Sequence, residues 1–149
     1  MYGESSEEPP LAWEWVEGQL VDGGVYWVVP SGSGPPHPRP VWGVWAESAL
    51  HLSIGSPPIV AALASAPEVT VHLGGATDVV IIEGVVLGSS VDPEVVAAYD
   101  AKYDWDYQIE EYGPLTVIRP RKVMAWRSAG WAGRDGFRQT GRWRLPPSD

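Results

Sequence analysis

The segment DVVIIEGVVLGSSV, residues 78–91, constrains the fold more than any other part of the chain. Nearly all of its side chains are apolar, which is typical of a strand that is buried on both faces. We therefore expect its own barrel to cover one face and a helix or a second subunit to cover the other. Gly84 lies within this strand and predicts a bulge or a close approach by another backbone.

Most of the remaining chain consists of short apolar runs between turns that are rich in Gly and Pro. These runs predict strands at 25–29, 39–46, 49–54, 68–74, 115–127 and 136–145, and helices within 11–24, at 56–66 and from Asp92 through Tyr107. Pro120 must lie at a bulge or on an edge of its strand. Short connections at regular spacing favour an antiparallel barrel over a doubly wound sheet. The prediction is one mainly β domain at 12–149, with six or seven strands and two or three short helices, behind a disordered tail at 1–11.

Charge limits the ligands that this chain can bind. The 149 residues carry a net charge of −9 and include no Cys, which argues against nucleic acid as a partner and excludes disulfides and thiolate metal sites. Residues 1–101 contain thirteen acidic residues and one basic residue, Arg39, whereas residues 102–149 contain six acidic and nine basic residues. An anionic ligand must therefore meet Arg39, the last third of the chain, or that region of a partner subunit.

The sequence also predicts where the protein acts. No apolar run approaches the ~20 residues that a membrane-spanning helix needs. The first residues, MYGESSEEPP, are acidic and lack the pattern of a signal peptide. We expect a soluble cytoplasmic protein that does not bind membranes.

The stretch HLSIGSPPIVAAL, residues 51–63, predicts a strand, a tight turn and the start of a helix. Ser56 is a good helix N-cap, and Pro57 lies where proline is tolerated, at the first helical position. A strand that runs into a helix N-terminus is a ready anion site, because free amide N–H groups point to one spot. Here, however, Pro57 and Pro58 each remove one donor, and no Lys or Arg lies nearby.

The order of these pieces, from HPRPVWGVWAESALHLSIGSPPIVAALASAPEVTVHLGGATDVVIIEGVV through AKYDWDY and LTVIRPRKVMAWR to GRWRL, resembles the pyridoxamine 5′-phosphate oxidase-like family of split β-barrels. This family comprises flavin and deazaflavin oxidoreductases, and the resemblance covers about residues 12–146. It implies a Greek-key split barrel, a homodimer, and two sites at the dimer interface for FMN or the deazaflavin coenzyme F-420. Such an enzyme transfers hydride between the cofactor ring and a small organic substrate, and the cofactor carries the chemistry.

The resemblance implies a cofactor site built from three segments. Arg39 matches a basic residue beside the cofactor phosphate, and the backbone of Pro40, Val41 and Trp42 would lie along the ring. Ser53 matches a hydroxyl residue that touches the cofactor tail, and Ile54, Gly55 and Ser56 continue that turn. Trp143, with Arg142 and Arg144 beside it, would approach from the partner subunit. The family carries an Arg-Lys pair where this chain has Pro58-Ile59, so either other cations replace that pair or the ligand differs.

Two alternatives follow from the same residues. Some relatives bind haem, for which His37, His51 and His72 are the candidate axial ligands. A dimer that has lost both cofactor and catalysis is the other alternative, because a fold does not imply an activity. Separately, Asp104, Asp106, Glu110 and Glu111 form an acidic stretch whose spacing matches no known cation-binding loop, so we interpret it as solvated.

Overall fold

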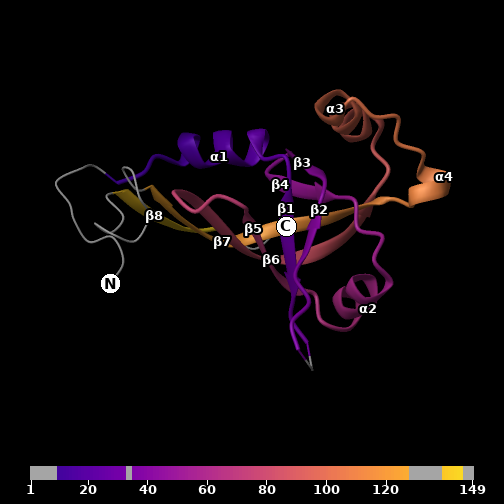
Figure 1. Ribbon diagram of the computed structural model, residues 1–149, viewed down its shortest axis with the longest axis horizontal. Helices are drawn as coiled ribbons and strands as arrows, with labels where there is room; N and C mark the ends of the chain where they lie inside the picture. The colour runs from indigo at the N-terminus through magenta and orange to yellow at the C-terminus, as the bar shows by residue number, and fades with distance from the viewer. Residues whose placement is uncertain (1–9, 33–34, 128–138, 146–149) are drawn as a thin grey trace.

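The computed structural model describes residues 10–32, 35–127 and 139–145 (Figure 1). The part of the chain that it describes contains four helices and eight strands. The helices are α1 (Trp13–Asp22), α2 (Pro57–Ser65), α3 (Pro93–Tyr103) and α4 (Ile109–Tyr112). The strands are β1 (Tyr26–Pro30), β2 (Arg39–Val41), β3 (Gly43–Ala46), β4 (Ala49–Leu52), β5 (Glu68–Leu73), β6 (Asp78–Ser90), β7 (Leu115–Arg127) and β8 (Gln139–Arg144).

The strands form one antiparallel sheet that closes on itself. Its order is β2-β1-β5-β6-β7-β4-β3, with β8 paired to β7 beside this path. β2 and β3 are two halves of the predicted strand 39–46, interrupted at Trp42, and they occupy the two ends of the order. The same segment therefore pairs with β1 and with β4, which makes a ring of six strands, and β8 adds a seventh. The predicted mainly β antiparallel barrel is confirmed.

The two longest strands, β6 and β7, carry the predicted irregularities. Their register shifts between Glu83 and Gly84, and again between Val86 and Gly88. Gly84 pairs with Pro120, and a Cβ atom on Gly84 would meet the Arg119 carbonyl oxygen at 2.6 Å. The predicted bulge at Gly84, the close backbone approach there and the placement of Pro120 at an irregularity are all confirmed.

One predicted helix end was wrong. The helix that begins at Asp92 ends at Tyr103 instead of Tyr107, because Asp104 adopts a left-handed conformation with φ of 51° and ψ of 56°. The number of helices was also wrong, since the short helix α4 follows in the segment after it. At the N-terminus, Leu11 is buried and donates its backbone N–H to the Thr140 carbonyl at 3.1 Å; residues 1–9 and 136–138 lie outside the described residues.

The core fills the barrel and continues under α1. One cross-sheet row, Val28, Val71, Ile82, Val123 and Trp143, faces this core, and Val16 and Leu20 of α1 pack into it. Figure 1 shows α1 along that side of the long strands. A second, smaller cluster joins α3 to β3 and β7 and includes Val44, Val95 and Leu115.

The next row of the same strands faces the opposite side. It consists of Trp27, His72, Ile81, Met124 and Arg142, each paired with its neighbour across the sheet. The first four side chains are partly exposed and Arg142 is exposed. The predicted apolar outer face of the long strand 78–91 therefore exists, and we call this row the outer row. No helix in the described part of the chain is long and apolar enough to cross a membrane.

Candidate cofactor site

The structure brings together two of the three segments that the sequence predicted for a cofactor. The backbone N–H of Ser53 donates to the Trp42 carbonyl at 2.9 Å, so the turn after β4 lies beside the break between β2 and β3. Trp42 is 40% exposed, and Arg39 and Pro40 are exposed as well, whereas Val41 is half-buried. Part of the Trp42 ring and the residues Arg39 and Pro40 therefore face solvent at this junction.

The turn itself is built differently from a phosphate loop. Ser56 is the N-cap residue of α2 and Pro57 opens the helix, as predicted, but the Ser56 side chain makes no capping hydrogen bond. Ile54 and Ile59 are buried in the main core, with Ile59 only 1% exposed. Pro58, by contrast, is exposed. Of the two positions that carry cations in the resembling family, only Pro58 faces solvent here.

Arg39 is the one basic side chain that the sequence placed in this region. Its guanidinium donates to the carbonyl of its neighbour Pro38 at 2.9 Å, and the described residues include no carboxylate paired with it. The remaining guanidinium N–H groups can therefore reach an anionic ligand.

Lys102 is the candidate site residue that the sequence analysis did not identify. Its ammonium donates to the Tyr26 hydroxyl at 2.8 Å and to the Gly43 carbonyl at 2.9 Å, and one of its three N–H groups is left over. Burial lowers the pKa of Lys102 to about 8, and the nearby Asp22 carboxylate opposes that shift. The last third of the chain was expected to supply a missing cation, and Lys102 lies in that third and binds the carbonyl of Gly43, the residue after Trp42.

Two tyrosines of α3 contact the two segments of the predicted site. The Tyr103 hydroxyl accepts from the Gly43 N–H at 2.9 Å, and its ring stacks flat on Trp42 with centroids 4.5 Å apart. Tyr99 is buried, and this burial raises the pKa of Tyr99 to about 12 although a hydrogen bond with the Ser53 side chain lowers it. α3 therefore contacts both segments of the predicted site, the strand break and the turn.

The third predicted segment does not reach this site within one chain. Trp143 pairs with Val123 on β7, whereas Leu52 at the turn pairs with Thr116. Those two β7 positions are separated by about 23 Å at a rise of ~3.3 Å per residue. Trp143 instead packs edge-on against Trp13 of α1, with centroids 5.4 Å apart, while Arg142 and Arg144 are exposed.

The three histidines occupy different environments. His51 is only 5% exposed; its Nε2 lies 3.1 Å from the Ala46 carbonyl oxygen, and its Nδ1 is buried without a partner. His72 stacks on Trp27 and places Nδ1 2.9 Å from the Leu73 carbonyl oxygen, which leaves Nε2 for a ligand. His37 is exposed in the Pro-rich loop.

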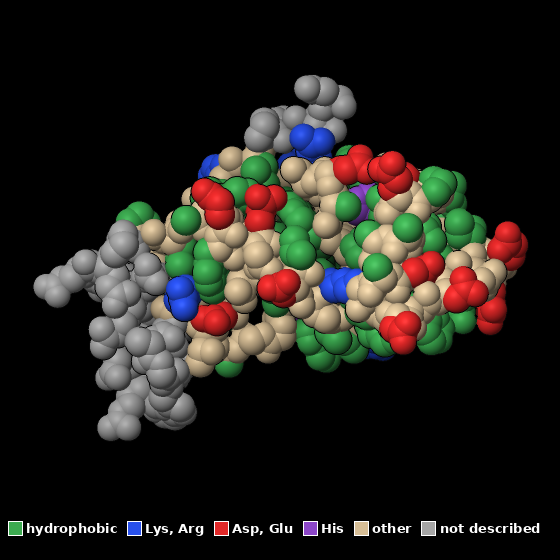
Figure 2. All heavy atoms as spheres, turned by 90° about the horizontal axis from the view of Figure 1, so that it is seen from above, with side chains coloured by type: hydrophobic (Ala, Val, Ile, Leu, Met, Phe, Trp, Pro, Cys, Tyr) green, Lys and Arg blue, Asp and Glu red, His purple; other side chains and the backbone are tan. Residues whose placement is uncertain are grey.

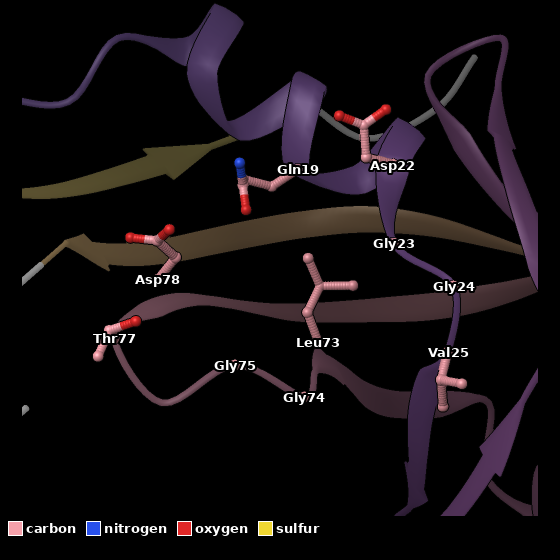
Figure 3. Close-up of a pocket in the computed structure, with 10 residues that line it drawn as sticks. All are labelled: Gln19, Asp22, Gly23, Gly24, Val25, Leu73, Gly74, Gly75, Thr77 and Asp78. Carbon is pink, nitrogen blue, oxygen red and sulfur yellow. The ribbon is translucent and has the colours of Figure 1, made fainter.

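A cavity of about 570 Å³ lies between the end of α1 and the β5–β6 turn (Figure 3). Gln19 extends into it from α1 toward Asp78, and four glycines form much of its wall. Its lining contains no Lys, Arg or His. An anionic phosphate would find carboxylates and no cation there, so this cavity is not the predicted cofactor site.

Comparison with known proteins identifies the fold. No family model matches the chain, and no curated protein matches it. Several solved structures match it in fold. An F420 reductase has a TM-score of 0.59 at 15% identity, covering 72% of this chain and 94% of that one. A FAD-binding protein from Mesorhizobium loti has a TM-score of 0.62 at 14% identity, covering 77% of this chain and 94% of that one. A heme binding protein from Mycobacterium smegmatis has a TM-score of 0.61 at 19% identity, covering 92% of this chain and 59% of that one.

The chain is a split β-barrel. At these identities the likeness establishes the architecture, and it confirms at that level the resemblance drawn from the sequence. Within this split barrel, the Trp42 junction is where two of the predicted site segments meet. It offers a partly exposed ring beside the cations Arg39 and Lys102.

Proposed function

We propose that this split barrel is an oxidoreductase that binds FMN or the deazaflavin coenzyme F-420 and transfers hydride between the cofactor ring and a small organic substrate. The observation that carries the proposal is the meeting of Trp42, the turn at Ser53 and the Lys102 ammonium. The likeness to an F420 reductase and to a FAD-binding protein supports it. When bound, the cofactor supplies the hydride chemistry, and no acidic or basic side chain is required for that step.

The chain's own residues would bind and orient the cofactor. Arg39 and the free N–H of Lys102 would hold the anionic part of the cofactor, because hydrogen bonds between charged partners are the strong ones. Trp42 offers a flat surface to the ring, and Tyr103 stacked on it fixes its orientation. Ser56 and Gly55 line the turn with small side chains, and a Cβ atom added at Gly55 would meet nothing within 4 Å. The turn is therefore open to a ligand.

Titration of the purified protein with FMN, F-420 and haemin, followed by visible absorption, tests this proposal. We expect a micromolar complex with FMN or F-420.

Arg39→Gln should weaken this complex about ten-fold or more, since one charge-assisted hydrogen bond contributes roughly 1.5–3 kcal/mol. Arg127→Gln is the matched control, because Arg127 is paired with Asp78 at the far end of β7. Pro58→Arg restores a cation at an exposed position and should tighten binding. No spectral change with either flavin would contradict the proposal and favour the dimer without a cofactor.

Haem binding is the second candidate, and His72 favours it. Its Nδ1 contacts a backbone carbonyl, which is the arrangement that orients a histidine whose other nitrogen binds a metal. The fold likeness to a heme binding protein supports the same alternative. A sharp haem band that disappears in His72→Ala but persists in His37→Ala would assign this function. A band that is unchanged by His72→Ala would exclude His72 as the ligand.

We further propose that the active form is a homodimer in the cytoplasm. The outer row supports the dimer, because Trp27, Ile81 and Met124 are apolar side chains on three strands and are only partly buried in one chain. A partner copy could also bring Trp143 and Arg142 to the Trp42 junction, which one chain alone does not do.

A further inference from the structure

Six aromatic side chains form a closed circuit of ring contacts beside α3. Its members, in order around the circuit, are Trp42, Tyr103, Tyr99, Tyr107, Tyr112 and Trp105. The distances between successive ring centroids, from Trp42–Tyr103 round to Trp105–Trp42, are 4.5, 5.0, 5.1, 5.4, 6.3 and 5.8 Å. We call this set the aromatic circuit. Trp42, Trp105 and Tyr112 are 40%, 45% and 41% exposed, so three large rings of the circuit face solvent.

The backbone holds the exposed rings in position. Asp104 ends α3 in the left-handed conformation, and the N–H of Trp105 then donates to the Asp100 carbonyl at 3.0 Å. The Asp100 carboxylate accepts from the Tyr107 N–H at 2.9 Å. The Tyr107 hydroxyl donates to the Gly113 carbonyl at 2.7 Å, which closes the segment. Because both ends are tied, the indole of Trp105 and the ring of Tyr112 are presented before any ligand arrives.

The same segment is strongly acidic. Asp104, Asp106, Glu110 and Glu111 are all exposed, and no Lys or Arg occurs from residue 104 to 118. Figure 2 shows carboxylates scattered among hydrophobic surface at the end of the molecule that contains α3 and α4. Exposed aromatic faces attract cations through their ring quadrupole, and surrounding carboxylates add a long-range attraction.

The kind of cation follows from the chemistry of the surface. Among the described residues there is no group of three or more His, Asp or Glu side chains able to hold a metal ion. Ring faces favour large, weakly hydrated organic cations, and quaternary ammonium groups are their usual partners. The molecule already contains one such contact, since the Lys102 ammonium lies 5.2 Å from the centroid of the Tyr103 ring.

We propose that the exposed part of the aromatic circuit binds an alkylated ammonium group, with the acidic residues of the 104–111 segment attracting it. The acidic stretch is then part of a ligand site rather than only a solvated face. This site shares Trp42 and Tyr103 with the proposed cofactor site, but its ligand and its test need no bound cofactor.

Choline and its neutral isostere 3,3-dimethylbutanol are the probes that test this inference. They have nearly the same shape and differ in charge. Indole N–H resonances of the full-length protein, followed by NMR during each titration, report binding at Trp42 and Trp105. We expect choline to shift these two resonances with a dissociation constant of about a millimolar, and 3,3-dimethylbutanol to bind at least five-fold more weakly. Equal binding of the two probes would overturn the proposal.

Variants separate ring attraction from apolar contact and from net charge. Trp105→Leu keeps apolar surface but removes the indole, and should weaken choline binding about three- to five-fold; Trp105→Phe should retain most of it. Asp106→Asn should weaken binding, whereas Glu14→Gln, which makes the same change in charge on α1, should not. Unshifted resonances of the remaining indoles would show that each variant is folded. Loss of choline binding on raising the protein concentration, or stronger competition by Mg²⁺ than by tetramethylammonium, would overturn the proposal.

Discussion

At the scale of single residues, Lys102 gives the sharpest prediction. Lys102 and Lys122 are the two lysines of the chain, so ¹³C-methylation of lysine amines gives one NMR resonance for each. Because burial lowers the pKa of Lys102 to about 8, its resonance should titrate with a midpoint near that pH. Lys122 provides the internal reference in the same spectrum. A midpoint for Lys102 near 10.5, the ordinary value for lysine, would show that the ammonium is not desolvated.

The same lysine makes stability depend on pH. The folded protein releases the Lys102 proton at a lower pH than the unfolded chain does. Between about pH 8 and 10.5 the unfolded state therefore binds more protons, and the Lys102 contribution to stability rises with pH. Tyr99, whose pKa is raised to about 12, acts in the opposite direction above pH 10. Urea unfolding of the wild type minus that of Lys102→Met isolates the lysine, and this difference should increase from pH 8 to 10. A constant difference would contradict the assignment.

The residues of the candidate site differ in how far the sequence could predict them. The resemblance assigned Trp42 and Ser53 to the site, and the structure brings them together. Lys102 depends on α3 packing against β1 and β3, and its two acceptors lie 76 and 59 residues away. Local pattern contains no information about such a contact. Ile59 shows the opposite problem. It stands where the resembling family carries a cation, yet its side chain is buried in the core.

At the scale of elements, an added methyl group should have opposite effects at two glycines, of which the first lies in the β6–β7 bulge. Gly84→Ala would place a Cβ atom 2.6 Å from the Arg119 carbonyl oxygen and 3.1 Å from Ile118, so the two strands must separate. We expect a loss of about 1–3 kcal/mol in the free energy of unfolding. Gly18 in the middle of α1 has nothing within 4 Å of an added Cβ atom. Gly18→Ala should therefore stabilise the protein by about 0.5–1 kcal/mol. Urea denaturation of both variants measures these changes, and an unaffected Gly84→Ala would show that the bulge adapts.

The ends of elements were harder to predict than their existence. The run from Asp92 contains good helix formers up to Tyr107, but the helix stops at Tyr103 because Asp104 turns left-handed and Asp100 binds the backbone beyond it. Aspartate is one of the few residues that tolerate this conformation, yet it is also acceptable inside a helix. The aromatic contacts that favour the early end involve Trp42, which is remote in sequence.

At the scale of the whole molecule, the open question is which surface buries the outer row of the sheet. A strand as apolar as β6 was expected to be covered on both faces, and one chain buries only its inner face, with Val80 and Ile82 at 0% and 1% exposure. A second copy related by a two-fold axis would cover the same row on both subunits. The neighbouring row on the same face, which includes Glu83, Lys122 and Arg144, carries charges of both signs.

Ile81→Glu tests this arrangement, because it puts a charge at the centre of the outer row on both copies. By sedimentation velocity at micromolar concentration we expect the wild type to be a dimer and Ile81→Glu a monomer, since an uncompensated buried charge costs several kcal/mol. Val21→Glu is the control; Val21 is 51% exposed on α1, which covers the other side of the long strands, and this variant should remain a dimer. If Trp143 of a second copy completes the cofactor site, Ile81→Glu should also weaken flavin binding. A wild type that stays monomeric, or an Ile81→Glu variant that stays dimeric, would mean that another surface covers the strand.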